Sequence, residues 1–294
     1  MSSRKWCRTL RSVLKFGKKL RTLYQLILEY KNMGSLLPSL ADYYKIKHLR
    51  MEDDERCGDL KGRLQIHRLP HGLYVAILSC PKYLRAYMTT FDEIYIQRIY
   101  NKLRDFVATE NDIVLDLGAF IGLYTLKHFK AKQIFAVEPH PISYSLLNIN
   151  VRLNRLDNVK CFNYAIWSYD TTMTLFEEEF LISGSTLIPA WHEGYHSKQI
   201  TIRTTSIDSL IEQGLIPRYI DIAKVDIEGA EAQFLEGGVK TLQRGSIDRM
   251  VMEVHKVIGI DLKSFYARLG ELGFRVVHII TGSETDIIYL KHVK

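Results

Sequence analysis

Four ionisable side chains follow or close two apolar runs in the second half of the chain. Asp226 and Glu228 come directly after the run 220–225, and Glu253 and His255 end the next run. A carboxylate or an imidazole can take the proton that a hydroxyl loses when it attacks an electrophile. His255 has the most suitable unperturbed pKa for this task, and Asp226 has the more central position. We therefore predict that all four are catalytic residues of a group transfer.

The same residue types permit other interpretations. Asp, Glu and His also bind divalent metals, so a metal site is an alternative role, although we assign no metal ligand. Crowded carboxylates can raise one another's pKa, which would suit a base. For Glu231 we expect only that it stabilises the N-terminus of the following helix.

A second group of residues has the pattern of a nucleoside site. Gly118 and Gly122 follow the apolar run 113–115, and Glu138 ends the apolar run 134–137. Glycines let the backbone approach a ligand closely, a helix N-terminus offers free N–H groups, and an acid after the second strand can accept both ribose hydroxyls. A buried structural turn is the alternative.

The details of this turn favour a cationic nucleoside over a dinucleotide. The middle glycine of a dinucleotide motif is missing, and Asp116 stands before the first glycine, where it would repel a pyrophosphate. S-adenosylmethionine carries an ammonium and a sulfonium group and fits better. After the third strand, residues 163–167 are expected to pack and hydrogen-bond an adenine. The predicted cofactor residues are Asp116, Gly118, Ala119, Gly122, Glu138, Pro139, Asn163 and Ala165.

The elements that would hold these residues alternate between strand and helix. This alternation predicts a parallel sheet with right-handed crossovers, in which ligands bind beyond the carboxyl ends of the strands. The chain ends in a hairpin, 274–280 with 287–291, which adds one antiparallel strand. The expected fold is an α/β, Rossmann-like class I methyltransferase fold with a seven-stranded, mostly parallel sheet. The expected strands are 113–115, 134–137, 159–164, 220–225 and 249–254, with inserted strands 173–176 and 200–204, and the expected helices are 123–129, 142–154, 207–213, 230–236, 239–244 and 262–272.

Two regions lie outside this alternation. The insert between the third and fourth strands contains Gly184-Ser185-Thr186-Leu187, and it is either a lid facing the substrate or a solvated loop. Residues 1–106 are expected to form an α-rich extension, separate from a catalytic domain at 107–294. The extension should contain a helix at 41–50, a hairpin of strands 64–69 and 73–78, and a helix at 91–106.

The extension begins with a basic amphipathic helix at 4–31, whose nine basic residues and one acid account for the excess positive charge of the chain, which has a net charge of +7. This helix could lie on anionic lipid or on RNA phosphates, or pack on its own domain with its lysines solvated. No apolar run reaches membrane-spanning length, and basic residues interrupt any signal-peptide core. The expected location is the cytoplasm, either free or at the membrane surface. The four cysteines have no C-x-x-C spacing, which disfavours a zinc site or a disulfide scaffold.

Seven short motifs occur in an order that resembles the FkbM family of S-adenosylmethionine-dependent methyltransferases. They are V-L-D-L-G-A-F-I-G-L-Y-T-L, A-V-E-P-H-P, N-V-K-C-F-N-Y-A-I, G-S-T-L, S-I-D-S-L-I, A-K-V-D-I-E-G-A-E and V-M-E-V-H. The resemblance covers about residue 112 to the C-terminus. It implies O-methylation of a hydroxyl, often on a sugar or polyketide. It also implies that Asp116, Gly118 and Glu138 hold the cofactor and that Asp226 and Glu228 line the methyl-transfer centre.

One position departs from the family pattern. The glycine turn usually reads G-A-N-x-G, but Phe120 stands where the asparagine is expected. The first hundred residues lie outside the resemblance, so the acceptor is not inherited from it. We expect an O-methyltransferase acting on a glycan or another hydroxyl-bearing small molecule. The alternatives are an RNA methyltransferase, which the basic helix suggests but no N-P-P-Y or D-P-P-Y motif supports, and a non-catalytic binding or membrane-associated protein that keeps the sheet.

Overall fold

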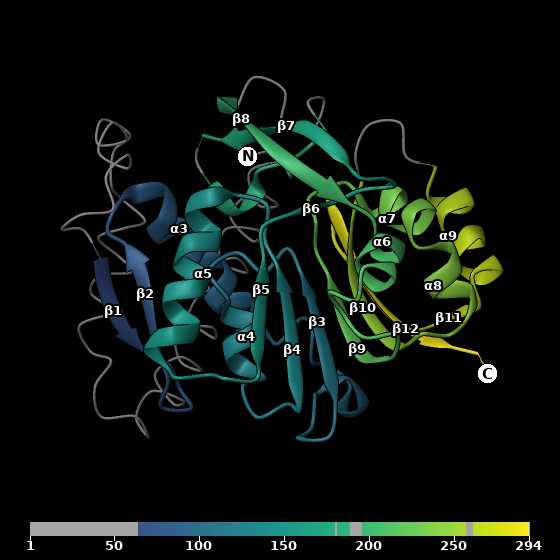
Figure 1. Ribbon diagram of the computed structural model, residues 1–294, viewed down its shortest axis with the longest axis horizontal. Helices are drawn as coiled ribbons and strands as arrows, with labels where there is room; N and C mark the ends of the chain where they lie inside the picture. Colours follow the sequence, from purple (N-terminus) through teal and green to yellow (C-terminus); the bar gives the residue numbers. More distant parts are fainter. Residues whose placement is uncertain (1–63, 180, 189–195, 257–260, 294) are drawn as a thin grey trace, which may run out of the picture. The chain divides into compact units, whose positions relative to one another are not determined.

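The computed structural model describes residues 64–293 except 180, 189–195 and 257–260. Its centre is a seven-stranded sheet with the order β11-β12-β10-β9-β3-β4-β5 (Figure 1). Only β12 runs against its neighbours in this sheet, since the other described pairings, apart from those of β12, are parallel. This confirms the mostly parallel sheet with a C-terminal antiparallel hairpin. The strands are β3 (Ile113–Leu117), β4 (Gln133–Val137), β5 (Val159–Phe162), β9 (Ile220–Val225), β10 (Ile247–His255), β11 (Phe274–Thr281) and β12 (Thr285–His292).

Helices cover both faces of the sheet. Successive residues of a strand point to opposite faces, and on β4 Phe135 and Val137 belong to a core that includes residues of α6 to α9. Ala136 lies between them and packs with Leu147 and Val151 of α5. The two cores leave the carboxyl ends of the strands free for a site. The helices are α4 (Leu123–Lys127), α5 (Pro141–Leu153), α6 (Ile207–Glu212), α7 (Glu231–Gly237), α8 (Val239–Gln243) and α9 (Leu262–Glu271).

The hairpin of β1 (Leu64–Arg68) and β2 (Tyr74–Leu78) was predicted from the sequence and is confirmed. It is attached to α5 by two asparagine side chains. Asn150 accepts the N–H of Ala76 at 2.6 Å and donates to its carbonyl at 3.2 Å. Asn154 makes the same pair of bonds with Tyr74, at 2.7 and 2.6 Å. These amides replace a neighbouring strand for β2.

The prediction of a helix at 91–106 is wrong. Helix α3 (Pro81–Phe91) begins ten residues earlier, with a proline in its first turn, and continues as the π-helix η2 (Asp92–Gln97). Arg98 then ends it in the left-handed conformation, with φ of 55°. A short 3₁₀ turn, η3 (Arg104–Phe106), precedes β3. The predicted helices at 4–31 and 41–50 lie outside the described residues.

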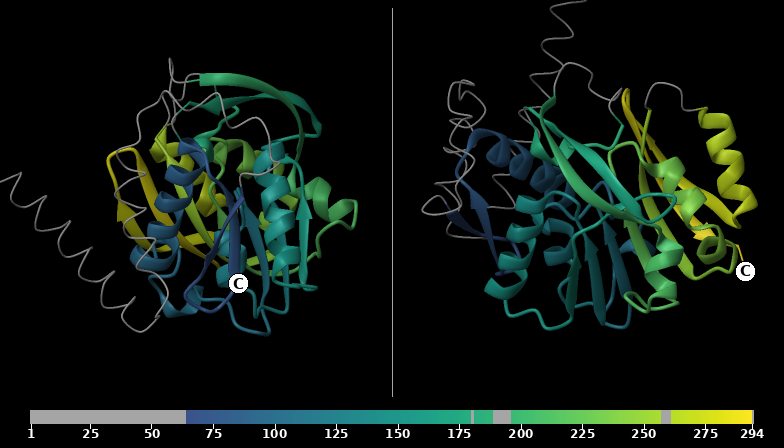
Figure 2. Two further views of the ribbon diagram at one scale, coloured as in Figure 1. Left: turned by 90° about the vertical axis from the view of Figure 1, so that its left-hand side faces the viewer. Right: turned by 45° about the horizontal axis from the view of Figure 1, so that its top comes forward.

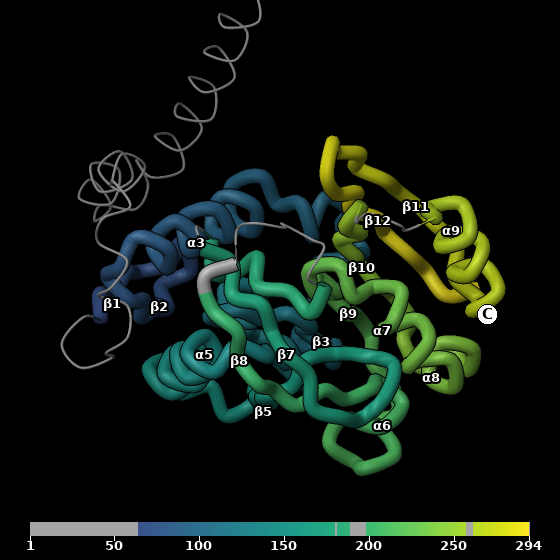
Figure 3. Tube along the Cα trace, turned by 90° about the horizontal axis from the view of Figure 1, so that it is seen from above, coloured from purple at the N-terminus to yellow at the C-terminus, as the bar shows by residue number. Residues whose placement is uncertain are grey.

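A second, three-stranded sheet is formed by the segment between β5 and α6. Its strands β6 (Ala165–Ile166), β7 (Thr171–Glu178) and β8 (His196–Thr205) have the order β6-β8-β7. They cross above the carboxyl ends of the main sheet, as the views in Figures 2 and 3 show. Glu177 of β7 pairs with Lys82 of α3 and with His140, whose Nε2 lies 2.9 Å away. The described part of the insert, 165–205, is thus structured, and we call it the roof of the site.

The cysteines differ in state. Cys161 is free, whereas Cys80, just before α3, is disulfide-bonded. The sequence analysis, which disfavoured a disulfide scaffold, did not predict this bond. Within the described residues, every helix is too short or too polar to span a lipid bilayer.

Candidate active site

A cavity of about 420 Å³ lies beyond the carboxyl ends of the strands, under the roof. The loops after β3, β4, β5 and β9 and the carboxyl end of β10 border it, as expected for ligand sites in parallel sheets. The roof contributes the turn η4 (Ile182–Gly184) and the following residues. Thr186 in this stretch donates to the carbonyl of Glu228 at 2.6 Å, which ties the roof to the loop after β9. The predicted residues that line the cavity are Gly118, Ala119, Glu138, Pro139, Ala165, Asp226, Glu228, Glu253 and His255.

Both glycines of the turn after β3 are required by the protein's own packing. Gly118 has φ of 76°, and a Cβ there would lie 1.7 Å from the carbonyl oxygen of Asp226. Gly122, with φ of 92°, precedes α4, and a Cβ there would lie 2.7 Å from Leu147. The glycines were predicted to let a ligand approach the backbone. Gly118 also lets the loop after β3 approach the loop after β9. Gly122 does not border the cavity.

Phe120 occupies the asparagine position of the family motif and has a left-handed backbone, with φ of 51°. Asparagine tolerates this conformation better than most residues, which accounts for the family's preference. The Phe120 ring instead stacks on Tyr83 of α3, with centroids 6.1 Å apart. Its N–H donates to Glu138 Oε2 at 2.7 Å. The departure from the motif thus preserves the hydrogen bond that the turn makes to Glu138.

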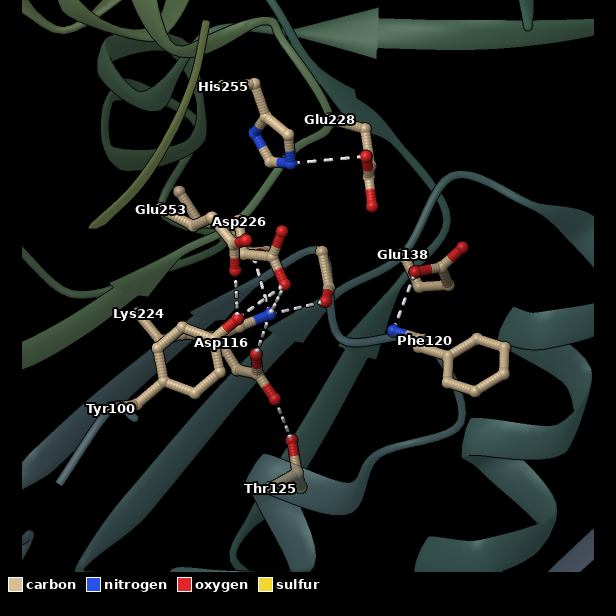
Figure 4. A network of polar contacts seen from close by, with 12 residues as sticks. Tyr100, Asp116, Phe120, Thr125, Glu138, Lys224, Asp226, Glu228, Glu253 and His255 are labelled. Carbon is tan, nitrogen blue, oxygen red and sulfur yellow. Dashed lines mark hydrogen bonds and ion pairs between the residues drawn. The ribbon is translucent and has the colours of Figure 1, made fainter. Parts of the chain in front are cut away.

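Glu138 borders the cavity and is held by two backbone groups. Figure 4 shows the first of them, the N–H of Phe120. The N–H of Phe120 binds one carboxylate oxygen, and that of His140 binds the other at 2.9 Å. Burial raises the pKa of Glu138 to about 8, although both hydrogen bonds oppose this shift. Each oxygen keeps a second lone pair, so the side chain can accept hydrogen bonds from two further hydroxyls.

Asp116 lies beneath the cavity and does not border it. It is completely buried, accepts a hydrogen bond from Thr125 at 2.7 Å, and lies 3.6 Å from Lys224 Nζ. Lys224 also contacts Asp226 at 3.1 Å and donates to the carbonyl of Gly118 at 2.7 Å. Burial opposes the charge on Lys224, yet the carboxylates of Asp226 and Asp116 raise its pKa. Direct contact between Asp116 and a cofactor does not fit this geometry; its charge holds Lys224 in place.

Asn163 also acts on the chain itself. Its amide donates to the carbonyls of Glu138 and Pro139, at 2.8 and 2.9 Å. It fixes the loop after β4 and does not border the cavity, whereas the adjacent Tyr164 and Ala165 do. The expected adenine contact therefore shifts from Asn163 to its neighbours.

Tyr100 links two of the predicted catalytic acids (Figure 4). Its hydroxyl lies 2.6 Å from Glu253 Oε2 and 3.1 Å from Asp226 Oδ2. Burial, together with repulsion from Asp226, raises the pKa of Glu253 to about 7. Burial acts in the same direction on Asp226, but Lys224 and His255 outweigh it and lower that pKa. Glu253 is thus the carboxyl whose proton affinity matches neutral pH.

His255 lies between two carboxylates and is 3% exposed. Its Nε2 is 3.2 Å from Glu228 Oε2, and its Nδ1 is 3.0 Å from Glu231 Oε1. Although burial favours the neutral ring, both carboxylates raise its pKa well above the usual value. An imidazolium that donates from both nitrogens cannot accept a proton, so this geometry disfavours His255 as the base.

The same argument bears on metal binding. Ligand atoms of Asp226, Glu228 and His255 lie within 4.8 Å of one another, a spacing that a divalent cation could use. A metal, however, needs a free lone pair on the imidazole. His255 has none while it donates to both Glu228 and Glu231, so the set of donors fits an ion-pair network better than a metal site.

Glu231 does more than stabilise α7. It is completely buried, accepts the N–H of Gly229 at 3.2 Å and orients His255. We predict that Glu231→Gln lowers the pKa of His255 by about 2 units, because a buried opposite charge is removed. Titration of the imidazole nitrogens by NMR measures this. Glu236→Gln, on the exposed side of the same helix, should leave the titration unchanged, and an equal shift in both variants would contradict the prediction.

Sequence reasoning missed three residues of the site: Glu93, Tyr100 and Lys224. Glu93 and Tyr100 precede the sheet, and no motif marks them. Lys224 had a signal, because a lysine inside the apolar run 220–225 must find buried partners. Its partners, Asp116 and Asp226, were both among the predicted site residues.

Comparisons with known proteins identify the family of this chain. A family model described as the methyltransferase FkbM domain matches residues 116–276. Hexuronic acid methyltransferase AglP of Haloferax volcanii is 29% identical over 164 residues, which are 56% of this chain and 64% of that protein. Methyltransferase sdnD of Sordaria araneosa is 28% identical over 158 residues, covering 43% of this chain and 60% of that protein. The chain spans less than two thirds of the length of these relatives.

Two solved structures match parts of the chain at low sequence identity. The FkbM methyltransferase of Methylobacillus flagellatus has a TM-score of 0.46 at 15% identity, covering 68% of this chain and 47% of that one. Trm5b of Pyrococcus abyssi has a TM-score of 0.42 at 15% identity, covering 78% and 56%. The match of the family model extends over more than half of the 294 residues. This chain belongs to the FkbM family of methyltransferases.

Proposed function

We propose that the protein is an S-adenosylmethionine-dependent O-methyltransferase whose acceptor is a hydroxyl of a glycan or small molecule. The observation that carries this proposal is the pairing of two different carboxyls in one cavity. Glu138 is anchored by two backbone N–H groups, as a ribose acceptor would be. Glu253 is bonded to Tyr100 and has a pKa of about 7, as a general base should have.

The cavity residues fit the proposed cofactor. Glu138 can accept two hydroxyls, and Pro139, Tyr164 and Ala165 offer an aromatic and apolar wall beside it. Bound S-adenosylmethionine would supply an electrophilic methyl group on a sulfonium. Ala119 and Gly118 border the same space. Asp116 supports this arrangement indirectly, through Lys224.

The remaining polar residues would act on the acceptor. Methyl transfer requires the attacking oxygen to be held about 3–3.5 Å from the methyl carbon. Glu253 would take the hydroxyl proton as the new C–O bond forms and the C–S bond of the sulfonium breaks, which leaves a neutral thioether. Asp226 stays ionised and can orient that hydroxyl, while the Tyr100 hydroxyl positions Glu253 and Asp226 beside each other. Glu228 and the His255 imidazolium would fix the opposite wall.

A glycan or small-molecule acceptor is favoured over RNA by the charge of the cavity. Asp226, Glu228 and Glu253 all border it, and a phosphate backbone would be repelled there. A relative in the family is named a hexuronic acid methyltransferase, which also favours a glycan. We keep 107–294 as the proposed catalytic domain, to which Tyr100 contributes from the preceding region. Contact of residues 4–31 with anionic lipid or RNA stays a prediction.

The test of the cofactor site is Glu138→Gln. We expect it to weaken S-adenosylmethionine binding about 100-fold, because two charge-assisted hydrogen bonds to hydroxyls are lost. In the native protein, binding should tighten as pH rises toward 8, because the ionised carboxylate is the better acceptor and burial holds a proton on it below that pH. The variant should lose this dependence.

Isothermal titration calorimetry over a range of pH measures both effects. Glu284→Gln is the matched control, because Glu284 is an exposed carboxylate at the edge of the same cavity. Unchanged affinity in Glu138→Gln would remove the ribose role and, with it, the reason to place the cofactor in this cavity.

A further inference from the structure

One wall of the cavity comes from a segment outside the residues that the family model matches. Thr89, Thr90, Glu93 and Tyr100 all precede residue 116, and all border the cavity. They belong to the end of α3, to η2 and to the loop after it. This wall faces the proposed base rather than the predicted ribose acceptor, since Tyr100 contacts Glu253. It is therefore placed to select the acceptor.

Three basic side chains of the described residues border the cavity, and all three are already paired. His140 contacts Glu177 at 2.9 Å. Lys224 contacts the carboxylates of Asp226 and Asp116. His255 contacts those of Glu228 and Glu231. None of these three side chains is free to compensate another acid.

Glu93 remains without a counter-ion. Among the described residues, its carboxylate makes no hydrogen bond or ion pair. Burial, followed by repulsion from Glu253, Asp226 and Glu228, raises its pKa to about 9. The side chain thus keeps a proton at neutral pH. A ligand that brings a positive charge can replace that proton, whereas a ligand carboxylate would add to the repulsion.

We infer that the acceptor carries an ammonium group that pairs with Glu93, beside the hydroxyl that is methylated. This inference rests on the proposed function and narrows its substrate to amino-bearing hydroxyl compounds such as amino sugars. It separates this protein from the relative named for a hexuronic acid, whose acceptor is an acid. Glu93 is then the residue that determines specificity.

The experiment uses three matched methyl glycosides as probes: glucoside, glucosaminide and glucuronide. Their binding to the full chain is measured by calorimetry with S-adenosylhomocysteine present, for the native protein, Glu93→Gln and the control Glu284→Gln. We expect the glucosaminide to bind about tenfold more tightly than the glucoside and the glucuronide to bind most weakly. Glu93→Gln should remove the advantage of the glucosaminide, and Glu284→Gln should keep it.

Other outcomes overturn the inference. They are a glucuronide that binds as tightly as the glucosaminide, a glucosaminide that does not bind, and a preference that survives Glu93→Gln. If Glu93→Gln instead weakens S-adenosylmethionine but not S-adenosylhomocysteine, the cofactor's sulfonium is the cation that Glu93 pairs with. Calorimetry of S-adenosylmethionine with the same samples distinguishes failure of this inference from failure of the proposed function. If the native protein does not bind S-adenosylmethionine, the proposed function itself is refuted.

Discussion

Glu253→Gln is expected to slow methyl transfer by roughly 10²–10⁴-fold, the usual contribution of a general base. The substitution keeps the size of the side chain and the oxygen that can accept from Tyr100. It removes the ability to take a proton. Binding of S-adenosylmethionine should be unchanged, because Glu253 lies at the acceptor side of the cavity.

The pH profile distinguishes this role from a structural one. In the native protein the rate should rise with pH through about 7, because the ionised form of Glu253 is the active one. His255 should contribute no step in this range, since its two carboxylate neighbours keep it protonated. The rise through about 7 should be absent in Glu253→Gln. Single-turnover rates with saturating cofactor measure the chemical step alone.

Loss of activity through unfolding would be recognisable. A carboxyl whose pKa is higher in the folded than in the unfolded state binds extra protons when folded, so stability falls as pH rises from about 4.5 to 7. Gln has no such titration, and the variant should be at least as stable as the native protein above pH 7. If the variant keeps the rise through pH 7, the base is another group, and Asp226→Asn is the next variant to test.

The sequence predicted the strands of the sheet well, because a strand buried on both faces leaves a local apolar run. The run 220–225 coincides with β9 at both ends. The run 134–137 differs from β4 by one residue. Turn residues then placed Asp226 and Glu138 after these strands, and the topology of a parallel sheet brought them to one cavity.

The failures concern contacts that only the tertiary structure creates. The polarity of the segment 91–106 does not reveal that Arg98 adopts a left-handed conformation and ends the helix. The type of Asp116 suggested a ligand contact, but Lys224 lies on the neighbouring strand, in register with it, and takes up its charge. Glu231 had the position of a helix-capping acid, and its bond to His255 depends on a residue of β10. Local patterns do not contain such pairings.

Gly118→Ala is expected to destabilise the fold more than any other single change proposed for the site. A left-handed residue with a Cβ costs about 1–2 kcal/mol for its backbone alone. At Gly118 the new Cβ would also lie 1.7 Å from the carbonyl oxygen of Asp226, which belongs to the backbone and cannot rotate away. We expect the free energy of unfolding to fall by about 4 kcal/mol or more, the range of exceptional substitutions. Urea denaturation followed by circular dichroism measures it.

Gly214 provides the matched control for this effect. Its φ of 70° is close to the 76° of Gly118, but a Cβ there would meet no atom within 4 Å. Gly214→Ala should therefore cost only the backbone strain, about 1–2 kcal/mol. The difference between the two variants isolates the contact between the loops after β3 and β9. Because Gly118 also accepts a bond from Lys224 at 2.7 Å, separating these loops should displace Asp226 and abolish methyl transfer in any molecules that still fold. Equal losses of stability in the two variants would mean that the loops separate easily, and then the position of Asp226 would not depend on this glycine.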